Sequence, residues 1–485
     1  MSLTLEGSLG ELEVVYAGAY TDRETNQVVD YTDYLFVGQY LPYYICDYYV
    51  TYTSFSPTGA PFGTCGTADL FVDSTTNTKV ESHEVRINAP INDTMSVTAG
   101  VFMSDTELME LNLFTYPGSL ANDITYAANY ALTDISVTGD RSDSGKSAVR
   151  AGAGWFSAAP FSEPVIFFND IRRTDEQKGI FGELNIALSD TSELTLGARW
   201  YDIEVDFEGS ANSSFGNGFG NPDEQRYGTN LSVQYAPGNP NGYPDKAKTD
   251  GVIGKVTYSW NPSEDVMYYV TWSEGFRPGL LNRPVGSGNE FYRVKPEVKS
   301  DEITNIEFGW KTILLDGQLR LNGSIFSVDV EGLQSTILDP AMNVNLFFSD
   351  NAADGTINGL EGDFEYLTNV DGLSVAGAFS FLNSEIKEAL LPTNDVVVGE
   401  NMAFAPEYQG NIRIRQEFGM SNGYVGHGQI QMVYSGESTS DIMEPNKATQ
   451  DSYSYLDIRV GMSNDDVVAE LYLSLIHISE PTRPD

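Results

Sequence analysis

Residues 305–325 read NIEFGWKTILLDGQLRLNGSI. Apolar side chains occupy every second position on both sides of Asp316-Gly317: Ile306, Phe308 and Trp310 before it, and Leu319, Leu321 and Ile325 after it. A period of two is typical of a β-strand whose two faces have different surroundings. Asp-Gly between two such runs is a strong signal for a tight turn. The stretch therefore predicts an antiparallel hairpin.

The same alternation recurs along the chain, and no comparably convincing long helix appears. The further alternating segments are 193–200, 255–260, 267–272, 361–367, 373–375 and 411–415. Aromatic residues make up 12% of the chain, which favours strands, and 46 glycines provide turn positions. The sequence predicts an all-β fold.

Short polar turns alternate with long polar connections. Asn261 to Asp265, Asp316-Gly317 and Asn369 to Gly372 are short turns. The long connections are expected at about residues 46–80, 105–160, 208–250, 280–300 and 385–405. This alternation is typical of an antiparallel transmembrane β-barrel, with short periplasmic turns and long outer loops. A soluble sandwich rarely has so many long loops in one domain.

Two features favour lipid rather than a protein core as the surroundings of the apolar face. The opposite face carries charges suited to a wet lumen, among them Glu193, Lys255, Glu307, Arg320 and Arg413. Aromatic residues also gather near strand ends, as in the interfacial girdles of membrane barrels: Trp260, Tyr268, Tyr269, Trp272, Phe291 and Tyr292.

The chain is strongly acidic, which excludes some classes of partner. Against 69 Asp and Glu stand 27 Lys and Arg, a net charge of −42. Nucleic-acid binding needs a basic surface, as does attachment to anionic lipid through basic residues. No run reaches the roughly 18 apolar residues of a membrane-spanning helix. The first residues lack a basic start and an apolar block, so we expect the natural N-terminus to lie upstream.

Residues 268–279, YYVTWSEGFRPG, resemble a motif of the TonB-dependent outer-membrane receptors, in which a Tyr-rich strand end is followed by Ser-x-Gly-Phe-Arg-x-Gly. Downstream, VKPE at 294–297, IEFGWKT at 306–312 and GLEGDFE at 359–365 are similar to further barrel motifs of that family, in the same order. Upstream, residues 84–102 and 181–201 resemble earlier barrel hairpins. The matches extend from about residue 80 to 470.

The resemblance implies an incomplete part of a barrel of about 22 strands. It assigns residues 1–473 to that barrel. The plug domain and the segment that engages TonB have no counterpart in the sequence and are expected in a missing N-terminal region. Residues 474–485 resemble translated sequencing-adapter DNA, so we expect a non-native tail there.

The resemblance also singles out motif positions, which we expect to shape strand ends and loops rather than to touch a ligand. They are Gly275, Phe276, Arg277, Pro278, Gly279, Glu307, Gly309, Lys311, Gly359 and Glu361.

The two cysteines, Cys46 and Cys65, lie in a stretch rich in Tyr, Gly and Thr. A pair that closes a short loop suits an oxidising compartment, so a disulfide is predicted, with two unrelated thiols as the alternative. No catalytic, cofactor or metal constellation is found. His83 and His427 are far apart, and no nucleophile or phosphate-loop motif appears. We therefore expect a protein that is not an enzyme and has no cofactor.

Together these observations predict an outer-membrane receptor of a Gram-negative bacterium for the energy-dependent uptake of a scarce nutrient, such as an iron–siderophore complex. Its partners would be the outer-membrane bilayer, the TonB complex and a small-molecule ligand such as a metal chelate, and not nucleic acid. Two alternatives remain at this point. One is a passive porin-like barrel, and the other is a secreted soluble all-β binding protein or surface enzyme.

Overall fold

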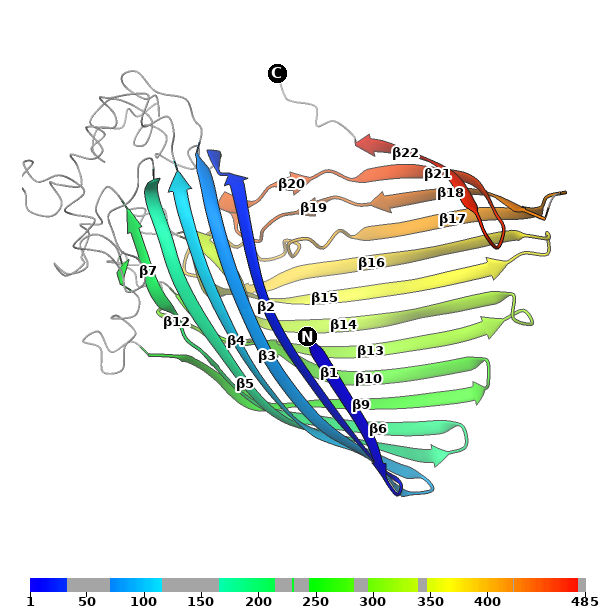
Figure 1. The fold of residues 1–485 in the computed structure, drawn as a ribbon, viewed down its shortest axis with the longest axis horizontal. Coiled ribbons are helices and arrows are strands. Elements are labelled where there is room, and N and C mark those ends of the chain that lie inside the picture. The colour runs from blue at the N-terminus through cyan, green and yellow to red at the C-terminus, as the bar shows by residue number, and fades with distance from the viewer. Residues whose placement is uncertain are drawn as a thin grey trace, which may run out of the picture.

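The computed structural model describes residues 1–32, 70–115, 165–213, 229–230, 244–282, 295–338, 347–421 and 423–478. They form a single large antiparallel sheet of 18 strands that curls around an open interior (Figure 1). The described residues include one 3-10 helix, η3 (Glu444–Asn446), and no α-helix. No helix among them is long and apolar enough to cross a membrane.

Most strands pair with the next long strand along the chain, so the sheet is a meander. β7 (Glu208–Ser213) and β8 (Thr229–Asn230) extend it beside β5. Two small pairs stand apart from it: β11 (Leu280–Leu281) with β12 (Glu297–Val298), and β19 (Ser438–Thr439) with β20 (Thr449–Gln450). The strands of the meander are β1 (Ser2–Leu9), β2 (Leu12–Asp30), β3 (Phe71–Asn92), β4 (Met95–Thr115), β5 (Val165–Ser189), β6 (Ser192–Val205), β9 (Ala247–Ser263), β10 (Val266–Arg277), β13 (Asp301–Leu314), β14 (Leu319–Leu338), β15 (Phe347–Leu367), β16 (Leu373–Ala389), β17 (Tyr408–Gly419), β18 (Val425–Ser435), β21 (Tyr453–Ser463) and β22 (Val468–Ile478).

The sheet does not close in the described part of the chain. β1 pairs only with β2, and β22 pairs only with β21. The predicted all-β, antiparallel and incomplete barrel is thus confirmed. β22 continues past the boundary expected at residue 473, because residues 474–478 pair with Tyr453 to Asp457 of β21. The division at that residue stays a prediction.

The short turns lie at one end of the strands and the long connections at the other (Figure 1). The predicted turn at Asp316-Gly317 joins β13 to β14, and Gly317 has a φ of 87°, a left-handed conformation that glycine adopts without strain. Gly372 fills the same role between β15 and β16, with a φ of 72°.

Several predicted loop boundaries are wrong. β3 begins at Phe71 and β4 continues to Thr115, inside the loops expected at 46–80 and 105–160, and β16 continues to Ala389. A long connection between β18 and β21 was not predicted. The outer strand ends carry polar side chains on both faces, as in residues 73–79, so they give no alternating signal. Cys46 and Cys65, for which a disulfide is predicted, lie outside the described residues, so their pairing stays a prediction.

The two faces of the sheet differ in polarity and in exposure. Polar side chains of one face are nearly buried although no second layer of described residues covers them: Thr195, Ser324, His427, Gln429 and Asp457 are 4–9% exposed. Side chains converge on the concave side of a curled sheet, so this polar face is the inner wall. Large apolar side chains on the other face, the apolar band, are 39–57% exposed: Leu5, Val85, Val101, Ile180, Trp200, Val256, Val270, Ile306, Ile325, Phe381, Ile412, Met432, Val460 and Leu473.

Candidate ligand-binding wall

The inner wall brings together five of the ten predicted motif residues. Gly309 and Glu307 of β13 lie opposite Tyr269 and Thr271 of β10. The ring of Tyr269 lies over Gly309, where a Cβ would come within 2.2 Å of the ring, and its hydroxyl donates to the carboxylate of Glu307. Gly309 therefore leaves the space that the tyrosine ring fills.

Gly359 of β15 has the same packing role. It lies opposite Phe326 of β14, and a Cβ there would come within 2.2 Å of the phenylalanine ring. Both glycines thus accept an aromatic ring from a neighbouring strand, which is consistent with a structural role for them.

Lys311 and Glu361 are exposed on the inner wall, and both line a cavity of about 520 Å³. Tyr269, Asn322 and Asp363 line the same cavity. The structure thus gathers a lysine and two carboxylates around one hollow of the inner wall, although they come from β13 and β15.

The Gly-Phe-Arg-Pro-Gly block lies at the outer end of β10, where it joins several elements. The Arg277 guanidinium donates to Asp301 of β13 at 2.7 Å through Nε, and the Arg277 backbone N–H donates to the same carboxylate at 3.0 Å. Asp301 is 1% exposed. Gln334 of β14 donates its backbone N–H to Asp301 and its side-chain amide to the carbonyl of Pro278 at 2.9 Å. The arginine therefore ties three strands together.

The remaining block residues pack against the wall. Phe276 stacks on Tyr201 with ring centroids 3.8 Å apart. The N–H of Gly279 donates to Thr249 Oγ1 at 2.9 Å, and a Cβ at Gly279 would meet the carbonyl of Val298 at 2.6 Å. Around Gly275, in contrast, a Cβ would meet nothing within 4 Å.

Sequence reasoning missed the residues that hold this block. Asp301, Gln334 and Thr249 belong to no motif, and single polar residues near strand ends give no signal of their own. Asn282, three residues after Gly279, holds the following segment, because its side chain donates to the carbonyls of Lys295 at 2.8 Å and Ser349 at 2.7 Å.

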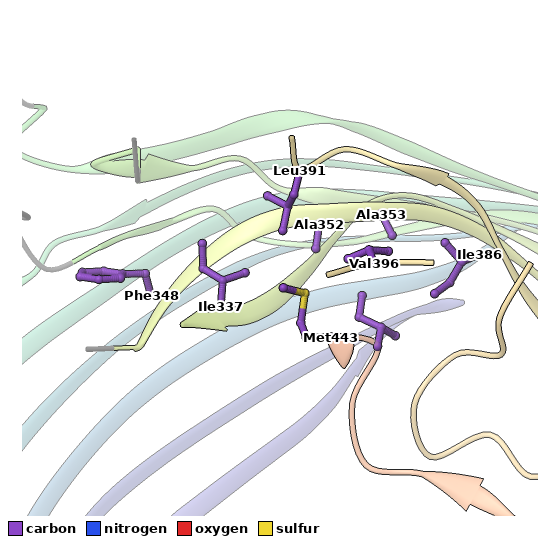
Figure 2. Close-up of a cluster of buried hydrophobic side chains, with 9 residues drawn as sticks. Ile337, Phe348, Ala352, Ala353, Ile386, Leu391, Val396 and Met443 are labelled. Carbon is purple, nitrogen blue, oxygen red and sulfur yellow. The ribbon is translucent and has the colours of Figure 1, made fainter. Parts of the chain in front are cut away.

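Two outer connections, residues 390–407 and 436–452, fold onto the outer ends of β14 to β16 and enclose a cluster of buried apolar side chains, which we call the outer cluster (Figure 2). Backbone pairing between Val396 and Met443 joins the two connections. The outer cluster consists of Ile337, Phe348, Ala352, Ala353, Ile386, Leu391, Val396, Ile442 and Met443.

Lys447 provides an electrostatic link beside the outer cluster. Its side chain is 14% exposed, and its ammonium group pairs with Glu444 and, at 3.6 Å, with Glu400 of the other connection. Burial alone would lower the pKa of Lys447, but the two carboxylates outweigh burial and raise it. The charge pair therefore holds the two connections together.

No group of three or more His, Cys, Asp or Glu side chains that could hold a metal ion occurs within the described ranges. His427 of β18 is hydrogen-bonded through Nε2 to the carboxylate of Glu470 of β22 at 3.0 Å, and His83 contacts Tyr16 at 2.8 Å on the opposite face. The two histidines are not brought together.

Comparisons with a family model and with a curated protein both match TonB-dependent receptors. A family model described as "TonB dependent receptor-like, beta-barrel" matches residues 11–474. A curated protein from Acinetobacter baumannii, "Probable TonB-dependent siderophore receptor PiuA", is 22% identical over 228 residues, which are 47% of this chain and 26% of that protein.

Solved structures share the fold. The ferric yersiniabactin uptake receptor FyuA from Yersinia pestis superposes with a TM-score of 0.61 at 12% identity, covering 95% of this chain and 52% of that one. The siderophore receptor PiuA from Acinetobacter baumannii gives a TM-score of 0.59 at 13% identity, covering 97% and 59%. The chain thus spans little more than half the length of these structures, and at this identity the likeness concerns the fold.

Proposed function

The chain belongs to the TonB-dependent receptor family, as part of its β-barrel, and on this premise we propose that it is the wall of a Gram-negative outer-membrane receptor for the uptake of a scarce nutrient. The observation that carries the proposal is the arrangement of the two faces. An apolar band suits lipid on the outside, and a polar inner wall with cavities suits a hydrated path.

The proposed ligand class is a metal chelate such as an iron–siderophore complex. The support is that relatives of similar fold carry names such as siderophore receptor and ferric yersiniabactin uptake receptor. The proposed energy source is the TonB complex, which would act through a region outside this chain. We propose a transport role and no enzymatic reaction.

The exposed apolar band argues against the soluble alternative. Side chains such as Ile306 and Val460 are more than half exposed in the middle of strands, and such a large continuous apolar surface in water would promote aggregation. A membrane fraction that releases the protein only with detergent is the expected result of cell fractionation.

Uptake assays test the receptor against the passive pore. The gene, together with the region proposed to engage TonB, would be expressed in a Gram-negative host without its own ferric-siderophore receptors, and in a sister strain that also lacks TonB. Radioactive iron supplied as hydroxamate, catecholate or carboxylate chelates should accumulate in the first strain and not in the second. Equal accumulation in both strains would instead indicate a passive pore.

A further inference from the structure

β16 forms the floor of a trough on the inner wall. Its inward positions are Ser374, Ala376, Ala378 and Ser380, all small. On one side they lie opposite Glu361, Asp363 and Glu365 of β15, and on the other side opposite Gln409, Asn411, Arg413 and Arg415 of β17. The rim on β15 is therefore acidic, and the rim on β17 carries amides and guanidinium groups.

The trough holds a second cavity, of about 200 Å³, next to the larger one. Arg320, Asp363, Asn411, Arg413 and Gln431 line it. Asp363, Ala378 and Asn411 also line the larger cavity, so the two are continuous along the wall.

The charges on the two sides of this cavity differ in their pairing. Arg320 lies 3.6 Å from both Asp363 and Glu365, so it is already shared between two carboxylates. Arg413, across the floor, has no ion-pair or hydrogen-bond partner within the described residues, although Arg415 of the same strand pairs with Glu417 at 2.8 Å. An arginine without a carboxylate is notable in a chain of net charge −42.

The neighbours of Arg413 add further free donors. The side-chain amides of Asn411 and Gln431 line the same cavity and, within the described part of the chain, also have no hydrogen-bond partner. Three donor groups thus face a hollow whose other side presents the carboxylate of Asp363, which is 45% exposed.

We propose that this cavity binds a zwitterion of the α-amino-acid type, with its carboxylate on Arg413, Asn411 and Gln431 and its ammonium group on Asp363. A guanidinium with flanking amides recognises a carboxylate well. A phosphate carries more negative charge than Arg413 alone can balance, because Arg320 is already shared between Asp363 and Glu365. The backbones of β15 and β17 are two strand spacings apart, about 10 Å, and the two side chains reduce that gap to the span of a small molecule.

The inference rests on the proposed function only in that a ligand reaches the inner wall. It deepens that function by assigning part of the wall to an amino-acid-like group, whether on a free amino acid or on a larger chelate.

Titration calorimetry on the full 485-residue chain in detergent micelles tests the site, with glutamine as the probe. The same molecule without its ammonium group, glutaramate, and without its carboxylate, 4-aminobutanamide, should each bind about tenfold more weakly, as expected for the loss of one charged contact. Inorganic phosphate should bind no better than glutaramate.

Variants locate the carboxylate contact. Arg413→Gln should weaken glutamine binding about tenfold and leave 4-aminobutanamide binding unchanged, because that probe has no carboxylate. Arg413→Lys should retain part of the affinity for glutamine, and the matched control Arg415→Gln should retain all of it. A shift in gel mobility between unheated and heated samples confirms that each variant folds.

Three results would contradict the proposed site. They are no glutamine binding, equal glutamine affinity of Arg413→Gln and the parent chain, or phosphate binding as tight as glutamine binding. Failure of iron uptake with intact, Arg413-dependent glutamine binding would contradict the proposed function and leave the site in place.

Discussion

Aromatic rings lie over glycines directly opposite them at many places in the sheet. A Cβ added to the glycine would overlap the ring in each pair: Phe181 with Gly100, Tyr201 with Gly251, Tyr269 with Gly309, Trp310 with Gly323, Phe326 with Gly359, and Phe379 with Gly362. Cross-strand pairs of this kind fix register, because a shift by one residue would move each ring away from its glycine. Two motif glycines are thereby explained by packing.

Gly309→Ala should destabilise the folded chain by about 1–3 kcal/mol, the usual cost of overpacking. The Tyr269 ring cannot move aside without losing its hydrogen bond to Glu307. Gly275→Ala is the matched control, since its Cβ meets open space, and it should be neutral or slightly stabilising. Denaturant unfolding in micelles measures both. Equal effects of the two substitutions would contradict the packing role.

The contribution of Lys447 to stability should depend on pH in the alkaline range, because its pKa is raised. A raised pKa means that its contribution to stability is fully present below the ordinary lysine value, about 10.4, and is lost as pH rises through the higher folded value. Acetylation, measured by mass spectrometry, should be slower at Lys447 than at Lys299 up to that pH, because Lys299 is exposed and its side chain has no ion-pair partner among the described residues. Equal labelling rates at pH 9 would show that the charge pair with Glu444 and Glu400 is absent.

Whole strands were predictable where one face is apolar and the other polar. The segment 305–325 predicted both β13 and β14 and the turn at Gly317, because alternation and the turn residues agree there. Strand ends beyond the apolar band were not predictable, since residues 73–79 of β3 are polar on both faces. The pairing of Arg277 with Asp301 was not predictable either, because it depends on which strands become neighbours.

The outer cluster depends on side chains from elements far apart in the sequence, so no local pattern predicts it. Ile386 of β16 is fully buried in this cluster, which also contains Val396 of one outer connection and Met443 of the other (Figure 2). Apolar contacts thus fix connections that would otherwise be held only by polar groups.

Ile386→Ala should cost about 2–5 kcal/mol, as for other large-to-small changes at buried sites. The loss should appear locally as faster hydrogen exchange and proteolysis in residues 390–407 and 436–452, because both connections contribute side chains to the same buried cluster. Leu390→Ala is a suitable control, since Leu390 is 40% exposed in the same segment. Unchanged protection of the second connection would show that the two are not coupled.

The whole molecule is organised by its two faces rather than by a central core. Most strands place apolar side chains outward and polar ones inward, and the large buried cluster shown in Figure 2 lies at the loop end. A soluble protein of this size would bury its apolar face between layers. Contact of the apolar outer face with lipid makes this arrangement stable.

A pair of adjacent substitutions on β18 tests that conclusion. Met432 is 48% exposed in the apolar band, and Val433 faces inward and lines the larger cavity. Met432→Arg should destabilise the chain in phospholipid vesicles by about 2–4 kcal/mol, the cost of an arginine at the lipid-facing midplane, whereas Val433→Arg should be tolerated. Urea titrations followed by tryptophan fluorescence give both values. If the outer face met water, Met432→Arg would cost little, and the inward substitution would be the more damaging one.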